Sequence, residues 1–336
     1  MPDRLAAVVG LVAAFLVGWV PPALAKCVGQ DLMVELRSTD PAGHDEILAR
    51  AREFANSEGR FWKIERDGTR PSYLFGTFHT EDALDYVPPE IWPALEGSDV
   101  VVFELDSNQV SAMETRMMSD PTFMFDPSAT PLSQRVPPDV LKEIRAALTE
   151  RGVPGPLGEQ MRPWMLFSLL SFPVCHIQAQ MQGAEPLDRH LSDRALELGI
   201  REIGLETYEE ALAVFKRTPI EEMMSLMTAQ SLQFDREEDL FATNLGFYAR
   251  GNVGAVLEFG LYMAEKEMPG VDIRDVQERF LDELLVARNI AWMPALLREI
   301  RRGNAFVGVG ALHLAGDAGL IELLRAEGYT VTLIAH

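Results

Sequence analysis

Apolar runs and alternating segments predict a series of short strands with helices between them. Residues 61–65 alternate apolar and polar positions, as expected for a strand with one buried face. Residues 100–103 are apolar throughout, as in a parallel strand covered on both faces. Gly68 and Pro71 indicate a turn that returns the first strand to a partner. The other predicted strands are residues 73–75, 200–205, 305–309 and 329–334.

Most of the remaining chain has helical patterning. Helices are expected at residues 45–57, 88–95 and 318–326, through most of 110–233, and in a long charged segment at 272–302. Proline-rich breaks divide the middle segment. The strand–helix–strand order at the end of the chain is that of a βαβ unit, which implies parallel strands. The sequence therefore predicts an α/β fold with a mainly parallel central sheet, flanking helices and a large helical insertion at about residues 107–300.

The N-terminus has the pattern of a secretory signal peptide. Arg4 precedes an apolar stretch from Leu5 to Val20, and Ala23-Leu24-Ala25 has the small residues of a cleavage site. Residues 1–25 are therefore predicted to be removed, leaving a single domain at 26–336 that is exported to the periplasm or secreted. An uncleaved membrane anchor is the alternative. A lipoprotein is disfavoured because Lys26 stands directly before Cys27.

Charge and cysteine content narrow the class of protein further. The formal net charge is −21, which repels phosphate backbones and anionic lipid heads. Nucleic-acid binding is therefore not expected, nor is membrane binding after cleavage of the signal. Cys27 and Cys175 are the only cysteines, and in an exported protein such a pair is predicted to form a disulfide.

Two histidines occur in matching surroundings. Gly76-Thr77-Phe78-His79 and Gly310-Ala311-Leu312-His313 each follow an apolar strand, and each is a G-x-x-H motif. Glycine permits a sharp turn as the chain leaves the strand, and open α/β sheets bind ligands beyond the carboxyl ends of their strands. The two imidazoles are therefore predicted to meet across one crevice. Two histidines that cap or pack independently are the structural alternative.

Two carboxylates occupy the same topological place. Glu104 follows the apolar strand at 100–103, and Glu206 follows the strand at 200–205. A charge at the end of a buried strand requires a partner, a metal or a function, although either carboxylate alone can simply begin a helix. Together with the two histidines they favour a site. Two His and one carboxylate are a three-ligand set for a catalytic divalent metal with an open water position.

Several segments of this chain resemble the TraB/PrgY/GumN family. The resemblance is carried by residues 72–79, by Phe103-Glu104-Leu105 and by residues 309–314. It extends over nearly all of residues 27–336. Further matching segments are Arg162-Pro163-Trp164, Leu187-Asp188, Gly204-Leu205-Glu206-Thr207, Arg288-Asn289 and residues 328–331.

The resemblance implies a fold similar to erythromycin esterases and ChaN-like proteins, with the paired G-x-x-H motifs at the site. The TIKI proteins, which look like distant members, are metal-dependent proteases. By position, the resemblance makes His79, Glu104 and His313 the central catalytic and metal-binding residues. Glu206 and Arg288 are added as a general base and as a group that steadies an oxyanion or a substrate carboxylate.

The sequence thus predicts an exported hydrolase, metal-dependent and peptidase-like, acting on a peptide or a small ester or glycan. A metal-free hydrolase, in which a His–Glu pair activates water, is an alternative. A non-catalytic peptide- or glycan-binding protein that uses the same crevice is a further one. The chain has no nucleophile elbow, Walker loop or dinucleotide fingerprint, so no organic cofactor is expected.

Overall fold

The computed structural model describes residues 26–336, and the predicted signal peptide at 1–25 lies outside these residues. Six strands of the described part form one sheet in the order β4-β3-β5-β2-β1-β6. The strands β4, β3, β5 and β2 run parallel, whereas β1 is antiparallel to both β2 and β6. The strands are β1 (Phe61–Glu65), β2 (Ser72–Thr77), β3 (Val100–Phe103), β4 (Arg201–Gly204), β5 (Ala305–Gly310) and β6 (Thr330–Ala335).

Two helices outside the insertion, α3 (Ile91–Glu96) and α18 (Leu320–Ala326), flank this sheet, with 3-10 turns at Glu81–Tyr86 and Ala311–His313. The other two, α1 (Leu32–Thr39) and α2 (Pro41–Ala51), pack against helices of the insertion instead. Val100 and Val102 point to one face of the sheet, where α17 (Ala287–Ile300) and α18 cover them. Val101 and Phe103 point to the other face, towards α3, α10 (Leu187–Glu197) and α14 (Glu237–Ala249). Both faces are therefore buried, which explains the unbroken apolar run of β3.

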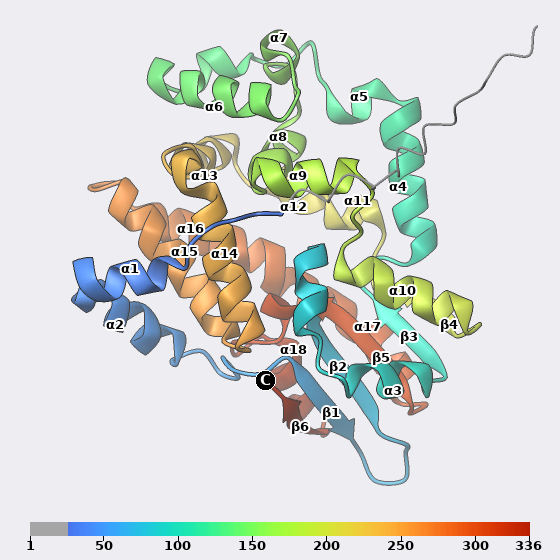
Figure 1. Ribbon diagram of the computed structural model, residues 1–336. Coiled ribbons are helices and arrows are strands. Elements are labelled where there is room, and N and C mark those ends of the chain that lie inside the picture. Colours follow the sequence, from blue (N-terminus) through green and yellow to red (C-terminus); the bar gives the residue numbers. More distant parts are fainter. Residues whose placement is uncertain (1–25) are drawn as a thin grey trace, which may run out of the picture.

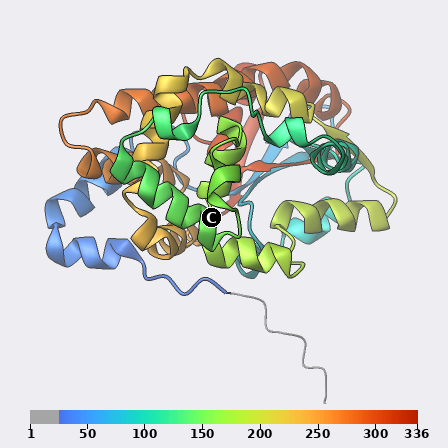
Figure 2. The same ribbon diagram turned by 90° about the horizontal axis from the view of Figure 1, so that it is seen from above.

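The segment between β3 and β5 is the helical insertion, broken by β4. In Figure 1 the β1–β2 hairpin turn lies at the bottom, so the carboxyl end of β2 points up towards these helices. Figure 2 shows the insertion helices above and around the strands. They are α4 (Ser107–Ser119), α5 (Pro121–Met124), α6 (Pro138–Glu150), α7 (Gly155–Gly158), α8 (Pro163–Leu170), α9 (Val174–Met181), α10 (Leu187–Glu197), α11 (Tyr208–Ala211), α12 (Ala213–Arg217), α13 (Ile220–Ser231), α14 (Glu237–Ala249), α15 (Val253–Glu267), α16 (Ile273–Leu281) and α17 (Ala287–Ile300), with 3-10 turns at Leu132–Gln134 and Phe234–Arg236.

The predicted fold class is confirmed, with differences at particular elements. The strands β1 and β3 have the predicted bounds. The helix expected at 45–57 begins earlier, at Pro41, because the Asp40 side chain accepts the Gly43 N–H and caps it. The strands β5 and β6 point the same way, as a βαβ unit requires, but β2 and β1 lie between them. The segment 272–302 is not one regular helix, because a π-helical turn separates α16 from α17.

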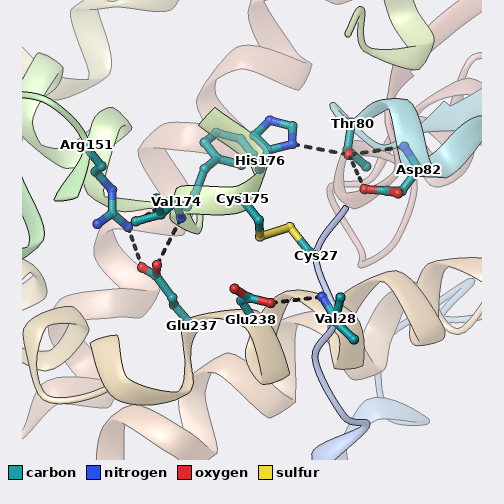
Figure 3. The surroundings of a disulfide bond; sticks show 11 residues. Cys27, Val28, Thr80, Asp82, Arg151, Val174, Cys175, His176, Glu237 and Glu238 are labelled. Carbon is teal, nitrogen blue, oxygen red and sulfur yellow. Dashed lines mark hydrogen bonds and ion pairs between the residues drawn. A yellow bond between two sulfur atoms is a disulfide. The ribbon is translucent and has the colours of Figure 1, made fainter. Parts of the chain in front are cut away.

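The predicted disulfide joins Cys27 to Cys175 on α9. Figure 3 shows how it holds the start of the described chain against the insertion. The Val28 N–H donates to Glu238 of α14 over 2.9 Å, and His176, next to Cys175, lies 3.4 Å from the Thr80 hydroxyl. Among residues 26–336, no helix combines the length and apolarity needed to cross a bilayer.

Removing the disulfide should lower the free energy of unfolding. The two cysteines are 148 residues apart, and closing a loop of that length constrains the unfolded chain by about 3–5 kcal/mol. We expect Cys27→Ser with Cys175→Ser to unfold at lower urea concentration than the oxidised protein. Reduced wild type should match the double variant. Equal midpoints for all three proteins would contradict the prediction.

Candidate functional site

The candidate site lies where four parallel strands end side by side. Thr77, the last residue of β2, is in register with Gly310, the last residue of β5. Phe103 of β3 is in register with both Gly308 and Gly204. Because the next few residues of each strand leave from the same edge of the sheet, their side chains share one region.

Gly310 marks the point on which three of the predicted site residues converge. A Cβ atom at this glycine would lie 3.2 Å from Glu104 Oε1, 3.4 Å from His79 Nε2 and 3.6 Å from His313 Cδ2. The structure therefore brings His79, Glu104 and His313 together, although they come from β2, β3 and β5. A side chain at position 310 would occupy the space between them.

The glycines of the two motifs act through space rather than through backbone freedom. We expected them to permit a sharp turn, but neither Gly76 nor Gly310 has a positive φ, and φ of Gly310 is −52°. A Cβ at Gly76 would lie 2.9 Å from the Ala311 Cα. Gly76 thus lets the turn after β5 pack against β2, and Gly310 leaves room for the side chains of the site.

His79 is oriented by an aspartate from the insertion. Its Nδ1 lies 2.8 Å from Asp188 Oδ2, and the other oxygen of Asp188 accepts the Thr77 hydroxyl. The ring is thereby turned so that Nε2 faces Gly310. The charge of Asp188 raises the pKa of His79 to about 9. The His79 side chain is 55 % exposed, so this imidazole is open to ligands.

Glu104 is a carboxylate that is 16 % exposed and has a partner on each oxygen. Oε1 accepts the Gly310 N–H over 2.7 Å, and Oε2 accepts Arg288 Nη2 over 2.7 Å. Burial alone would raise the pKa of Glu104, but the adjacent charges, among them Arg288, lower it to about 2. The group is therefore ionised at neutral pH.

His313 is held in its neutral form beneath the site. Its Nδ1 lies 2.7 Å from Asn289 Oδ1, and the Asn289 amide donates to the His313 carbonyl over 3.2 Å. The Trp292 ring covers it, with the ring centroids 4.4 Å apart. Burial lowers the pKa of His313 to about 3. The lone pair is consequently on Nε2, which lies 3.2 Å from Arg288 Nη1.

Arg288 links the predicted residues into one network. Its guanidinium donates to Glu104 and, through Nε over 3.0 Å, to Glu206. Burial raises the pKa of Glu206, while its ion pair with Arg288 opposes that shift. Arg288 is the second residue of α17, which follows the π-helical turn Asp282–Val286, and it also donates to the Leu284 carbonyl in that turn. Such turns are frequent at functional sites because they re-aim side chains.

Two imidazoles and one carboxylate are the types of ligand that a divalent cation binds. Each imidazole is fixed through Nδ1 by an oxygen, Asp188 for His79 and Asn289 for His313, as is usual for metal-binding histidines. Within residues 26–336, however, no three His, Cys, Asp or Glu side chains stand at the spacing of a formed metal site. Two of the candidate ligand atoms, Glu104 Oε2 and His313 Nε2, contact the Arg288 guanidinium instead.

The part of the chain that contains these residues matches a known family. A sequence model of the TraB/PrgY/gumN family matches residues 60–333, a range that contains the whole network. The chain belongs to the TraB/PrgY/gumN family. The resemblance inferred from the short motifs is thereby confirmed. No solved structure gives a significant match, so the expected likeness to erythromycin esterase and ChaN-like folds stays a prediction.

Individual relatives within and beyond bacteria are distant. The chain is 23% identical over 316 residues to metalloprotease TIKI1 of Danio rerio, covering 80% of this chain and 62% of that protein. It is 22% identical over 334 residues to metalloprotease TIKI2 of Xenopus tropicalis, covering 84% and 61%. It is 23% identical over 267 residues to the uncharacterized protein YbaP of Shigella flexneri, covering 78% and 90%. The chain thus spans about three fifths of the TIKI relatives.

Sequence reasoning assigned no role to Asp188 and Asn289. Both stand in segments that matched the family, Leu187-Asp188 and Arg288-Asn289. The available signal was that each is a polar residue in the first turn of a helix of the insertion. Their contacts with His79 and His313 depend on how α10 and α17 pack on the sheet, which no local pattern encodes.

Asp188→Asn should lower the pKa of His79 from about 9 towards its ordinary value of 6.5. Because the pKa is raised in the folded protein, the imidazolium stabilises the fold fully below pH 6.5, and this contribution is lost as the pH rises through 9. The variant should lose that dependence. NMR titration of the His79 ring in chelator-treated protein measures the shift. Asp193→Asn, on the same helix, is the control, and a wild-type His79 that titrates near 6.5 would contradict the prediction.

Proposed function

We propose that this protein is an exported, peptidase-like hydrolase that uses a divalent metal ion held by His79, Glu104 and His313. The observation that carries the proposal is the convergence of these side chains around Gly310. Both metalloproteases named above are relatives of the chain, which supports a hydrolytic reaction. Glu104 and His313 are deprotonated at neutral pH, as metal ligands must be, whereas His79 would have to lose its proton to bind the ion.

When bound, a divalent cation supplies Lewis acidity that polarises a carbonyl and lowers the pKa of water. The residues of the chain supply orientation and charge. Asp188 and Asn289 hold the two imidazoles so that Nε2 of His79 faces Gly310 and Nε2 of His313 faces Arg288. Arg288 is the cationic group nearest to Glu104, and in this proposal its N–H groups stabilise negative charge that develops on the substrate.

Glu206 is assigned to positioning rather than to proton transfer. Sequence reasoning made it the general base, but its carboxylate is bonded to Arg288. It accepts from both Nε and Nη2 of Arg288, and Nη2 also donates to Glu104. The Glu206 side chain is 6 % exposed. In this proposal Glu206 therefore acts through Arg288.

Export is supported by two features of different kinds. Residues 1–25 have the pattern of a signal peptide. The disulfide between Cys27 and Cys175 belongs to proteins that reach an oxidising compartment. The periplasm or the extracellular medium is therefore the proposed location, with a peptide or a small ester or glycan as substrate and no nucleic-acid partner.

A metal-free hydrolase is the second candidate, and the position of Arg288 favours it. The guanidinium lies where it neutralises Glu104 and contacts the lone pair of His313. A cation is then not needed to balance the buried carboxylate. In that reaction Glu104 accepts a proton from water, and the His79 imidazolium gives one to the leaving group.

Metal analysis with turnover separates the two candidates. Protein purified without chelator is assayed for bound metal by mass spectrometry and for cleavage of a peptide and ester panel. The metal-dependent hydrolase predicts about one ion per chain, activity lost with EDTA, and recovery on addition of Zn²⁺, Mn²⁺ or Co²⁺. Activity that is indifferent to EDTA in metal-free protein would select the second candidate. The absence of all turnover would reject both.

His79→Ala and His313→Ala should each abolish turnover and strongly reduce bound metal. Each removes one of three ligands, and the loss of a single ligand weakens such a site severely. Circular dichroism should show the fold retained. His190→Ala is the matched control, because His190 lies on α10 outside the site. Full metal content in either ligand variant would count against the proposed ligand set.

Glu206→Gln should reduce turnover by roughly 10–100-fold while metal content stays close to wild type. The amide keeps the shape but loses the charge that holds Arg288. Parallel measurement of kcat and metal content tests this. A fall in both to the same extent would show that Glu206 is itself a ligand.

A further inference from the structure

A pocket opens directly from the network at the strand ends. Its volume is about 310 Å³, and His79, Glu104 and Arg288 form one wall. The apolar side chains that line the rest are Phe103, Leu105, Val110, Pro186 and Ala211.

The charged groups in the pocket lining are already paired within the protein. His79 pairs with Asp188, and Glu104 pairs with Arg288. Arg189, the remaining charged residue of the lining, pairs with Asp193 one turn along α10, with the nearest atoms 3.0 Å apart. Because each charged side chain of the lining already has an opposite charge beside it, a charged ligand group would have to displace an existing ion pair, whereas a neutral group would not.

The hydroxyl groups of the lining are also engaged. Ser107 and Ser192 both line the pocket. Their hydroxyls donate to the two oxygens of one carboxylate, Glu202, over 2.5 and 2.6 Å. The proton of each hydroxyl is therefore committed to Glu202, and towards the pocket these groups can act only as acceptors.

The wall that carries Val110 and Ala211 is braced. Val110 lies on α4, and Ala211 is the last residue of α11. The Tyr208 N–H at the start of α11 donates to Gln109 of α4 over 3.2 Å. Glu202, which binds both Ser107 of α4 and Ser192 of α10, fixes the opposite side. The pocket is consequently preformed, as specificity pockets usually are.

We propose that this pocket binds the neutral, apolar group next to the scissile bond of the substrate, and that Val110 and Ala211 set the length of the group it accepts. The assays of turnover below depend on the proposed hydrolytic function. The substrates expected are those with a linear or branched hydrocarbon side chain or acyl chain next to the scissile bond. Acidic and basic groups are excluded at this subsite.

A series of p-nitrophenyl esters from acetate to decanoate measures the preference. Each methylene buried in the pocket should raise kcat/KM about three- to fourfold, until the pocket is filled and longer chains lose the gain. Val110→Phe should reduce the ratio of kcat/KM for octanoate to kcat/KM for acetate at least tenfold. Val110→Ala should move the optimum to a longer chain. This second variant keeps the test informative even if the bulkier Val110→Phe variant fails to fold.

Ala112→Phe is the matched control. Ala112 lies two residues further along α4, is exposed, and does not line the pocket. It should leave the chain-length profile unchanged. Turnover that is independent of chain length, or a profile that Val110→Phe and Val110→Ala leave unaltered, would overturn the pocket assignment while the hydrolase stands.

Binding of octanamide, followed by ligand-observed NMR, keeps the two proposals separate. If no ester is cleaved but octanamide binds, and Val110→Phe weakens that binding at least tenfold relative to Ala112→Phe, the hydrolase is rejected and the pocket is supported. Octylammonium and octanoate should bind more weakly than octanamide. No binding of octanamide to the wild type, or a preference for either ion, would overturn the pocket assignment.

Discussion

The whole site depends on how the carboxylate of Glu104 is neutralised. Glu104 follows a strand whose four residues are buried, so its charge stands at the edge of the sheet core. An unpaired charge in such a place costs several kcal/mol. The Gly310 N–H and the Arg288 guanidinium together satisfy it. One contact ties β3 to β5, and the other ties both strands to α17.

These two contacts also fix the remaining groups. Arg288 contacts Glu104 from the first turn of α17, which directly follows the π-helical turn and lies at the strand ends. The same register places Asn289 against His313 and Trp292 over the His313 ring. Glu206, at the end of β4, completes the pairing of Arg288. The guanidinium of Arg288 thus joins the carboxyl ends of β3, β4 and β5 to the first turn of α17.

The sequence predicted the parts of this architecture that local patterns encode. β1 and β3 were located because alternation and an apolar run are direct consequences of burial on one or both faces. His79, Glu104 and His313 were found because each follows a strand. The position of β6 beyond β1, and the contacts of Asp188 and Asn289, depend on how distant elements pack. The motif glycines were expected to allow a sharp backbone turn. In the structure they instead leave space for close contacts, and φ of Gly310 is negative.

The net charge of the side chains at the site bears on whether Arg288 and a divalent cation can be present together. Glu104, Glu206 and Asp188 face one guanidinium, that of Arg288, and one imidazolium, that of His79, which leaves a single net negative charge. Loss of the His79 proton would leave two, which is the charge that a divalent cation neutralises. Arg288 and such a cation are therefore compatible in charge. They would compete for the lone pair of His313 Nε2 and for Oε2 of Glu104, so the contacts of Arg288 with these two atoms are the ones that would change if a cation bound.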